Sequence, residues 1–263
     1  MTSVHDFAQF KANGQKISMV TAYDAWSARL VARSRVDAVL VGDSAAMVIH
    51  GHPTTLAATV RVMALHTAAV ARGVGGKFVI ADLPFLSFRK GIRAAMTAVG
   101  ALTTSGAQAV KLEGVDGHEE VIRQIVGSGV PVMGHVGLTP QSVNRFGGFR
   151  VQGRNAGDAA DLFRQAHVLQ DLGCFSIVLE CVPAELAARM TSDLEVPVIG
   201  IGAGAGTDGQ ILVLHDLWGV DTSHMPRFVR PYIDGERILT DALDRYDTDV
   251  KETRFPGIEE SYS

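Results

Sequence analysis

Short apolar runs alternate with longer amphipathic segments along most of the chain. The apolar runs are rich in β-branched residues and end in polar or glycine-containing turns, which is typical of buried parallel strands. The segments between them carry apolar side chains at helical spacing and end near a glycine. This alternation predicts repeated βα units around a parallel sheet. Seven strands are clear, in KISMVTAYD, VDAVLVGDS, KFVIADLP, AVKLEG, PVMGHVGL, FSIVLECVP and VPVIGIGAG.

The number of βα units favours a (β/α)8 TIM-type barrel, an α/β fold in a single domain. We expect residues 1–263 to form that domain, with a short N-terminal segment and a charged C-terminal tail over about 235–263. The clearest helices are predicted in 54–73, 118–129 and 156–173. An eighth strand is expected near RFVRPYI (227–233), after a helix in DGQILVLHDLWG (208–219).

Polar side chains stand at or near the C-terminal end of most predicted strands. In a βα barrel all strands direct this end to one face, so groups far apart in sequence converge there on one pocket. The residues concerned are Asp24, Asp43, Ser44, Asp82, Lys111, Glu113, His135 and Glu180.

Two of these residues, Glu113 and Glu180, have apolar neighbours, in KLEG and VLECV. Because glutamate is a poor turn former and an unpaired buried carboxylate costs several kcal/mol, we expect each to be buried with a partner. Several carboxylates at one barrel mouth repel one another unless a metal ion or a lysine lies among them. Oxygen-only ligands favour magnesium or a similar hard ion.

Other members of the set admit two interpretations each. Lys111 lies two residues before Glu113, so both project to one side of a strand, as a recognition pair for an anionic substrate or as a plain ion pair. His135 suits either a pocket or a hydrogen-bonded core. Asp24 and Ser44 equally suit helix caps, since Asp and Ser commonly follow strands.

Composition narrows the class of ligand. The 263 residues carry 24 Lys and Arg against 28 Asp and Glu, a formal charge of -4, so no basic excess points to nucleic acid or an anionic membrane. No apolar run approaches the roughly 18 residues of a membrane span. Cys174 and Cys181 show no disulfide or thiolate-metal spacing. We expect a cytoplasmic protein with reduced cysteines that acts on small molecules.

Two further motifs carry weaker signals. His50 and His52 lie in a predicted loop without a third ligand in spacing, which disfavours a metal site. GIGAGAG (200–206) satisfies the glycine spacing of a dinucleotide fingerprint, yet it follows six strands instead of opening the fold. It is better interpreted as a tight turn or a close backbone approach to a ligand.

Taken together, the motifs closely resemble the ketopantoate hydroxymethyltransferase family. The resemblance spans roughly residues 16–232 and follows the family's order. It is carried by VTAYD, VGDS, HTAAVARG, ADLPF, AVKLEG, PVMGHVGLTPQSVNRFGGFRVQG, VLECVP, IGIGAG and DGQILVLHD.

The resemblance implies a magnesium-dependent barrel of the phosphoenolpyruvate mutase and isocitrate lyase type. It implies transfer of a one-carbon unit from 5,10-methylene-tetrahydrofolate to 3-methyl-2-oxobutanoate, giving ketopantoate for pantothenate and coenzyme A biosynthesis. It also implies a homo-oligomer, a decamer as in bacterial members of the family. Nothing in these motifs addresses nucleic acid or a membrane.

The site residues follow from the same resemblance, position by position. Asp43 and Asp82 match the metal-binding aspartates, which also face the substrate, and Glu113 matches the acidic residue that completes the predicted metal set. Ser44 and Lys111 match the positions that hold the keto acid, and His135 one near the new hydroxyl. Glu180 matches the proposed catalytic base.

These roles predict a magnesium-stabilised enolate formed when buried Glu180 removes a proton beside the ketone. The stretch TPQSVNRFGGFRVQG (139–153), with Gly147 and Gly148, is predicted to be a mobile loop that keeps water away. The alternatives are a folate-independent 2-oxo acid carbon-carbon lyase of the same superfamily, an NAD-dependent oxidoreductase built around GIGAGAG, and a non-catalytic scaffold.

Overall fold

The structure is a computed structural model that describes residues 2–221 and 225–262. It comprises two compact units, Met1–Val213 and Leu214–Ser263. The predicted single domain over residues 1–263 stays a prediction.

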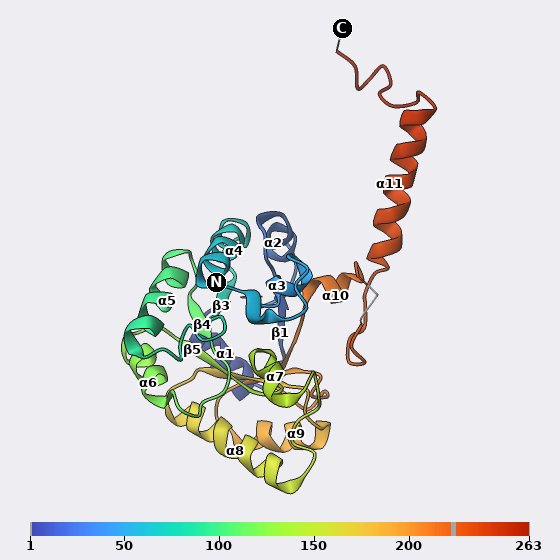
Figure 1. Cartoon of the computed structure of the whole chain (residues 1–263). Coiled ribbons are helices and arrows are strands. Elements are labelled where there is room, and N and C mark those ends of the chain that lie inside the picture. The colour runs from blue at the N-terminus through green and yellow to red at the C-terminus, as the bar shows by residue number, and fades with distance from the viewer. Residues whose placement is uncertain (1, 222–224, 263) are drawn as a thin grey trace. The chain divides into compact units, whose positions relative to one another are not determined.

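The first unit is built on a closed barrel of parallel strands paired in chain order, with β1 next to β8. Helices lie between successive strands from β1 to β7 and surround the barrel (Figure 1), and a turn without a helix joins β7 to β8. The predicted (β/α)8 barrel is therefore confirmed. The strands are β1 Ile17–Thr21, β2 Ala38–Val41, β3 Phe78–Asp82, β4 Ala109–Lys111, β5 Val132–Gly137, β6 Ser176–Glu180, β7 Val198–Ile201 and β8 Gly209–Leu212.

Several helices of this unit, including α2, α4 and α8, begin where the sequence supplies a capping side chain. The side chains of Asp24, Thr59 and Asn155 each accept a hydrogen bond from the backbone N–H three residues later, at the starts of α2, α4 and α8. The three helices predicted most clearly from the sequence appear as α4, α6 and α8. The bounds are α1 Val4–Ala12, α2 Ala25–Ala32, α3 Ala45–Val48, η1 Thr55–Ala57, α4 Val60–Gly73, α5 Ile92–Thr104, α6 Glu119–Gly127, η2 Pro140–Ser142, α7 Val143–Phe146, α8 Ala156–Asp171 and α9 Ala184–Asp193.

The barrel interior is filled by alternate strand residues, as the two-residue period of a strand requires. Phe7 of α1 is fully buried against this core, with its ring 5.9 Å from that of Phe78 and 5.4 Å from that of Phe175. Both partners lie at the N-terminal ends of their strands, so α1 closes that end and leaves the C-terminal end for the site. The core residues are Phe7, Ile17, Met19, Ala38, Leu40, Phe78, Ile80, Ala109, Met133, Val178, Ile199 and Ile211.

The predicted position of the eighth strand is wrong. The strand is β8, inside the segment 208–219 that the sequence analysis assigned to a helix, and 227–233 forms turns and irregular chain. The error has a physical cause, because an unbroken apolar run such as Ile211–Leu214 has no period that separates a strand from a buried helix. Pairing decides it: β8 hydrogen-bonds to both β1 and β7 and closes the barrel.

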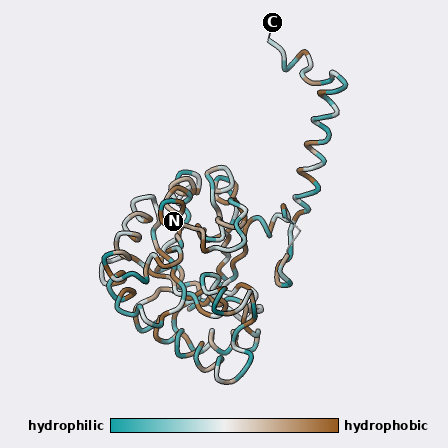
Figure 2. The backbone as a smooth tube through the Cα atoms, in the orientation of Figure 1, coloured by the Kyte–Doolittle hydropathy of each residue, from teal (hydrophilic) through white to brown (hydrophobic). Residues whose placement is uncertain are grey.

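The second unit contains α10 Leu214–Trp218 and α11 Gly235–Lys251. The charged tail predicted from the sequence is thus largely helical. Along α11 hydrophobic and hydrophilic positions alternate (Figure 2), and Leu239, Leu243, Tyr246 and Val250 are exposed. Among the described residues, no helix is both long and apolar enough to cross a membrane.

We predict that Gly209→Ala destabilises the barrel by about 1–3 kcal/mol, the usual cost of overpacking. A Cβ at Gly209 would lie 2.4 Å from the backbone oxygen of Ile17 in β1 and 2.7 Å from Cδ1 of Ile199 in β7. Urea unfolding measures the loss. Gly100→Ala in α5 is the matched control, since its Cβ meets nothing within 4 Å and should leave stability equal or higher. Equal stability of both variants would contradict the closure of the barrel through β8.

Candidate active site

The strand pairing brings most of the predicted site residues to the C-terminal end of the barrel. Asp82 and Lys111 are the last residues of β3 and β4 and lie opposite each other, and Glu180 ends β6 opposite Gly137 of β5. Contacts join them to residues that follow β2 and β4 or lie within β5. We call this group the polar cluster: Asp43, Asp82, Lys111, Glu113, His135 and Glu180.

Lys111 is the cation of the polar cluster. Its side chain is only 5% exposed, and its Nζ lies 2.9 Å from Oδ1 of Asp82 and 3.3 Å from Nδ1 of His135. Burial by itself lowers the pKa of Lys111, yet the carboxylates of Asp82, Glu113 and Asp43 outweigh it and raise that pKa above its ordinary value. Lys111 is therefore held in its charged form.

When ionised, the four carboxyl groups of the cluster carry more negative charge than Lys111 alone can neutralise. Burial, and next the charge of Asp82, raise the pKa of Asp43 to about 7. Burial, and next the charge of Asp43, raise the pKa of Glu113 well above its usual range. The backbone N–H of Asp43 donates to Oδ2 of Asp82 at 3.0 Å, which fixes the two aspartates as neighbours. Such a site favours an additional cation.

His135 and Glu180 form the second half of the cluster. The ammonium of Lys111 can only donate, so Nδ1 of His135 accepts from it and the neutral ring carries its proton on Nε2. Burial, and next the charge of Lys111, hold the pKa of His135 well below its usual value, which keeps the ring neutral. His135 Nε2 lies 3.2 Å from Oε2 of Glu180.

Glu180 combines burial with access. Burial raises its pKa to about 7, and Lys111 offsets part of that rise. Its side chain remains 15% exposed, more than its neighbour His135 at 2%. A carboxylate of this kind can take up a proton near neutral pH, which is what a general base requires.

Two buried polar atoms of the polar cluster have no hydrogen-bond partner among the described residues. They are Oδ1 of Asp82, despite its ion pair, and Nε2 of His135. Buried polar atoms normally form hydrogen bonds, so the missing partners of these two atoms indicate that a ligand completes the site.

The cluster fits a magnesium ion held mainly by Asp43 and Asp82. Among the residues that the structure describes, no three His, Cys, Asp or Glu side chains surround a common point for an ion. Magnesium is commonly bound by only one or two carboxylates, with water and substrate oxygens completing its octahedron. The neighbouring aspartates, the unsatisfied Oδ1 of Asp82 and the excess of negative charge agree with that chemistry.

Ser44 and Asp24, the two candidates for helix caps, differ in the structure. Asp24 does cap α2, where its Oδ1 accepts from the N–H of Ser27 at 2.8 Å. Ser44 precedes α3 without capping it through its side chain, and its Oγ instead lies 2.8 Å from the hydroxyl of Tyr23. Tyr23 thus orients the hydroxyl of Ser44, which directly follows Asp43 in sequence.

Gln141 belongs to the site but was missed by the sequence analysis. It lies in η2, in the loop after β5, and its amide donates to Oδ2 of Asp43 at 2.8 Å and to the carbonyl of Leu83 at 2.9 Å. Its backbone N–H donates to Oε2 of Glu113 at 2.9 Å. The only sequence signal is its place in the predicted loop 139–153.

The other motifs are explained by packing. GIGAGAG leads into β8 and not into a helix, so it lacks the strand-turn-helix of a dinucleotide fingerprint. A Cβ at Gly204 or Gly206 would lie 2.4 Å or 2.7 Å from an alanine Cβ of α9, which explains these glycines by close packing. Nε2 of His50 lies 2.9 Å from Nε2 of His66, and His52 is exposed.

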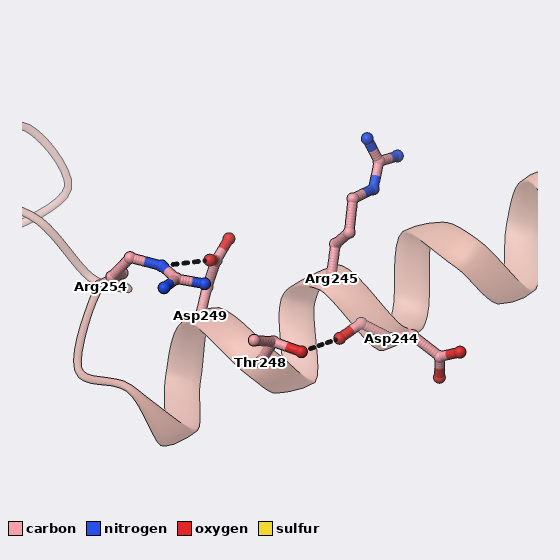
Figure 3. A pocket seen from close by; sticks show the side chains of 5 residues that line it. All are labelled: Asp244, Arg245, Thr248, Asp249 and Arg254. Carbon is pink, nitrogen blue, oxygen red and sulfur yellow. Dashed lines mark hydrogen bonds and ion pairs between the residues drawn. The ribbon is translucent and has the colours of Figure 1, made fainter.

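A separate hollow lies on α11 in the second unit (Figure 3). It is lined by Asp244, Arg245, Thr248, Asp249 and Arg254, and Nε of Arg254 pairs with Oδ1 of Asp249 at 2.8 Å. It contains none of the residues predicted for the site, and four of its five lining residues are charged.

Known proteins resemble this chain along almost its whole length. The sequence pattern of the family described as ketopantoate hydroxymethyltransferase matches residues 1–258. The 3-methyl-2-oxobutanoate hydroxymethyltransferase of Bdellovibrio bacteriovorus is 54% identical over 263 residues, 100% of both chains. The protein of the same name from Legionella pneumophila is 50% identical over 260 residues, 98% of this chain and 99% of its own.

Solved structures share the fold at low sequence identity. Phosphonopyruvate hydrolase in complex with oxalate and Mg²⁺ superposes with a TM-score of 0.67 at 13% identity, over 99% of this chain and 93% of its own. A 2,3-dimethylmalate lyase described as a member of the PEP mutase/isocitrate lyase superfamily gives 0.62 at 16% identity, over 100% and 92%.

We predict that Lys111→Met destabilises the protein by about 3–5 kcal/mol, because breaking a buried pair leaves its partner's charge uncompensated. The exposed pair of Lys251 with Asp247, 2.7 Å apart, provides the control. Lys251→Met should change the free energy of unfolding by less than about 1 kcal/mol. Urea denaturation compares the two variants, and equal losses would show that Lys111 does not balance buried charge.

Proposed function

Because this chain belongs to the ketopantoate hydroxymethyltransferase family, an enzyme family of pantothenate biosynthesis, we propose that it makes ketopantoate at the polar cluster. The substrate is 3-methyl-2-oxobutanoate, and the one-carbon donor is 5,10-methylene-tetrahydrofolate. The observation that carries this proposal is a partly accessible Glu180, whose pKa lies near neutrality, at the same barrel end as several carboxyl groups that share Lys111 as their cation.

Asp43 and Asp82 would hold a magnesium ion, with Glu113 beside it. When bound, the ion supplies positive charge that offsets the negative charge developing on the keto acid. Manganese is an equivalent hard ion for binding experiments.

Lys111 and Ser44 would bind and orient the keto acid. The ammonium of Lys111 is buried and permanently charged, so it attracts the anionic substrate without rearrangement. The hydroxyl of Ser44 is preset by Tyr23 at 2.8 Å. A substrate held this way presents the carbon beside its ketone to Glu180.

Glu180 takes the proton from carbon 3 of the substrate, next to the ketone. Desolvation raises the proton affinity of its carboxylate and makes it a stronger base than an exposed glutamate. The electron pair left on carbon 3 then forms the bond to the methylene carbon of the folate, which reacts as an iminium ion after one of its carbon–nitrogen bonds has opened. A water molecule then replaces the remaining carbon–nitrogen bond, so that tetrahydrofolate leaves with the electron pair and the water oxygen becomes the new hydroxyl. The Nε2–H of His135, with its proton fixed by Lys111, would donate to the oxygen of the new hydroxyl.

The loop over 139–153 would keep bulk water away from the carbanion until it has attacked the donor. It holds η2 and α7, and Gly147 and Gly148 have φ of +65° and +116°, which L side chains rarely adopt. Such a glycine pair is suited to a hinge at which the loop closes over the donor.

The proposal also includes a cytoplasmic location and a homo-oligomeric state. Cys174 and Cys181 are free and buried, which suits the reducing cytoplasm. The exposed Leu239, Leu243, Tyr246 and Val250 of α11 support a homo-oligomer, for which the family resemblance suggests a decamer.

We predict that product formation depends strictly on methylene-tetrahydrofolate. Purified protein, magnesium and 3-methyl-2-oxobutanoate should give ketopantoate only when the folate is added, as measured by mass spectrometry of the keto acid product. Cleavage of a 2-oxo acid without folate would instead support the carbon-carbon lyase, whose superfamily shares this barrel.

We also predict that Glu180→Gln binds the keto acid but loses exchange of the hydrogen at carbon 3 with solvent deuterium, followed by NMR. In the wild-type enzyme the exchange rate should rise with pH and be half-maximal near pH 7, because only ionised Glu180 accepts the proton. Glu185→Gln, at an exposed position of α9, is the control and should exchange normally. Wild-type exchange in Glu180→Gln would remove Glu180 as the base.

A further inference from the structure

Gln141 is the residue that joins three separate loops of the barrel mouth. It is 7% exposed, and its three contacts reach Asp43 after β2, Leu83 after β3 and Glu113 after β4. These partners lie 98, 58 and 28 residues away in sequence. A buried residue with this many distant polar contacts fixes the relative positions of the groups that it touches.

The orientation of the Gln141 amide follows from its partners. The carbonyl oxygen of Leu83 can only accept, so the amide atom 2.9 Å from it must be the NH₂ group. That group has two hydrogens, and the second reaches Oδ2 of Asp43 at 2.8 Å. Both hydrogens are therefore used, and a flipped amide would face each partner with the wrong atom.

The contacts hold the carboxylates without neutralising them. Gln141 donates to one oxygen of each acid, Oδ2 of Asp43 and Oε2 of Glu113. Oδ1 of Asp43 and Oε1 of Glu113 remain available for other partners. An uncharged donor also leaves the attraction of the acids for a cation largely intact. A lysine or arginine here would compete with the ion, and a glutamate would repel Asp43.

We propose that Gln141 is the positioning residue of the metal site, which orients the Asp43 carboxylate toward the ion through its side-chain amide. This inference rests on the proposed function, because it concerns the ion that the enzyme would use. Partners of this kind behind a metal ligand fix its orientation and usually change metal affinity when they are lost.

The test is a titration of the metal-free full-length protein with Mn²⁺, with free Mn²⁺ measured by electron paramagnetic resonance. Gln141→Met keeps the length of the side chain and removes the two amide hydrogens that donate hydrogen bonds. Its dissociation constant for Mn²⁺ should rise about 10- to 100-fold. Gln141→Asn keeps an amide that is one methylene too short, and it should also weaken binding.

Gln165→Met is the matched control, because Nε2 of Gln165 also donates to an aspartate carboxylate, Oδ2 of Asp161 at 2.6 Å, but on an exposed helix surface. Its Mn²⁺ affinity should stay within twofold of wild type. Hydrogen exchange at carbon 3 of the keto acid supplies a second readout. Saturating Mn²⁺ should restore that exchange in Gln141→Met, whereas a purely structural defect would persist.

Wild-type Mn²⁺ affinity in both Gln141 variants would overturn the inference while leaving the proposed function intact. A lower unfolding midpoint with unchanged Mn²⁺ affinity would overturn it equally, since Gln141 would then be only structural. Absence of Mn²⁺ binding by the wild-type protein would instead refute the metal assignment itself. If Gln141→Met fails to fold, the affinity of Gln141→Asn decides.

Discussion

The structure depends on one electrostatic constraint at the C-terminal end of its barrel. Asp43, Asp82, Glu113 and Glu180 are brought together around the cation of Lys111, and burial raises the pKa of three of them. Burial of unbalanced charge is unfavourable, so the arrangement is stable only with protons or a further cation. The same imbalance makes the cluster suited to a divalent ion and to a base that titrates near neutrality.

The polar cluster lies apart from the apolar core that stabilises the barrel. The apolar side chains inside the strands and Phe7 below them form the packed interior. The last residues of the strands are therefore free to be polar, and the parallel order directs Asp82, Lys111 and Glu180 to one face. Stability and chemistry are separated along each strand, which allows one rigid scaffold to hold several acids close together.

Much of this arrangement could be predicted from the sequence. Alternating apolar runs indicate strands, and a glutamate such as Glu180 within such a run indicates a buried functional group. The position of β8 could not be predicted, because its apolar run continues into α10 without a period. Gln141 could not be predicted either, because its importance arises only when three loops meet in space.

A crystal structure of the protein with Mn²⁺, in which anomalous scattering locates the ion, is the decisive measurement. We expect one strong anomalous peak bonded to carboxylate oxygens of Asp43 and Asp82, on the Glu113 side of the barrel mouth. A peak elsewhere, or no peak in crystals soaked in millimolar Mn²⁺ at pH 8, would refute the assignment of these aspartates as ligands of a divalent ion.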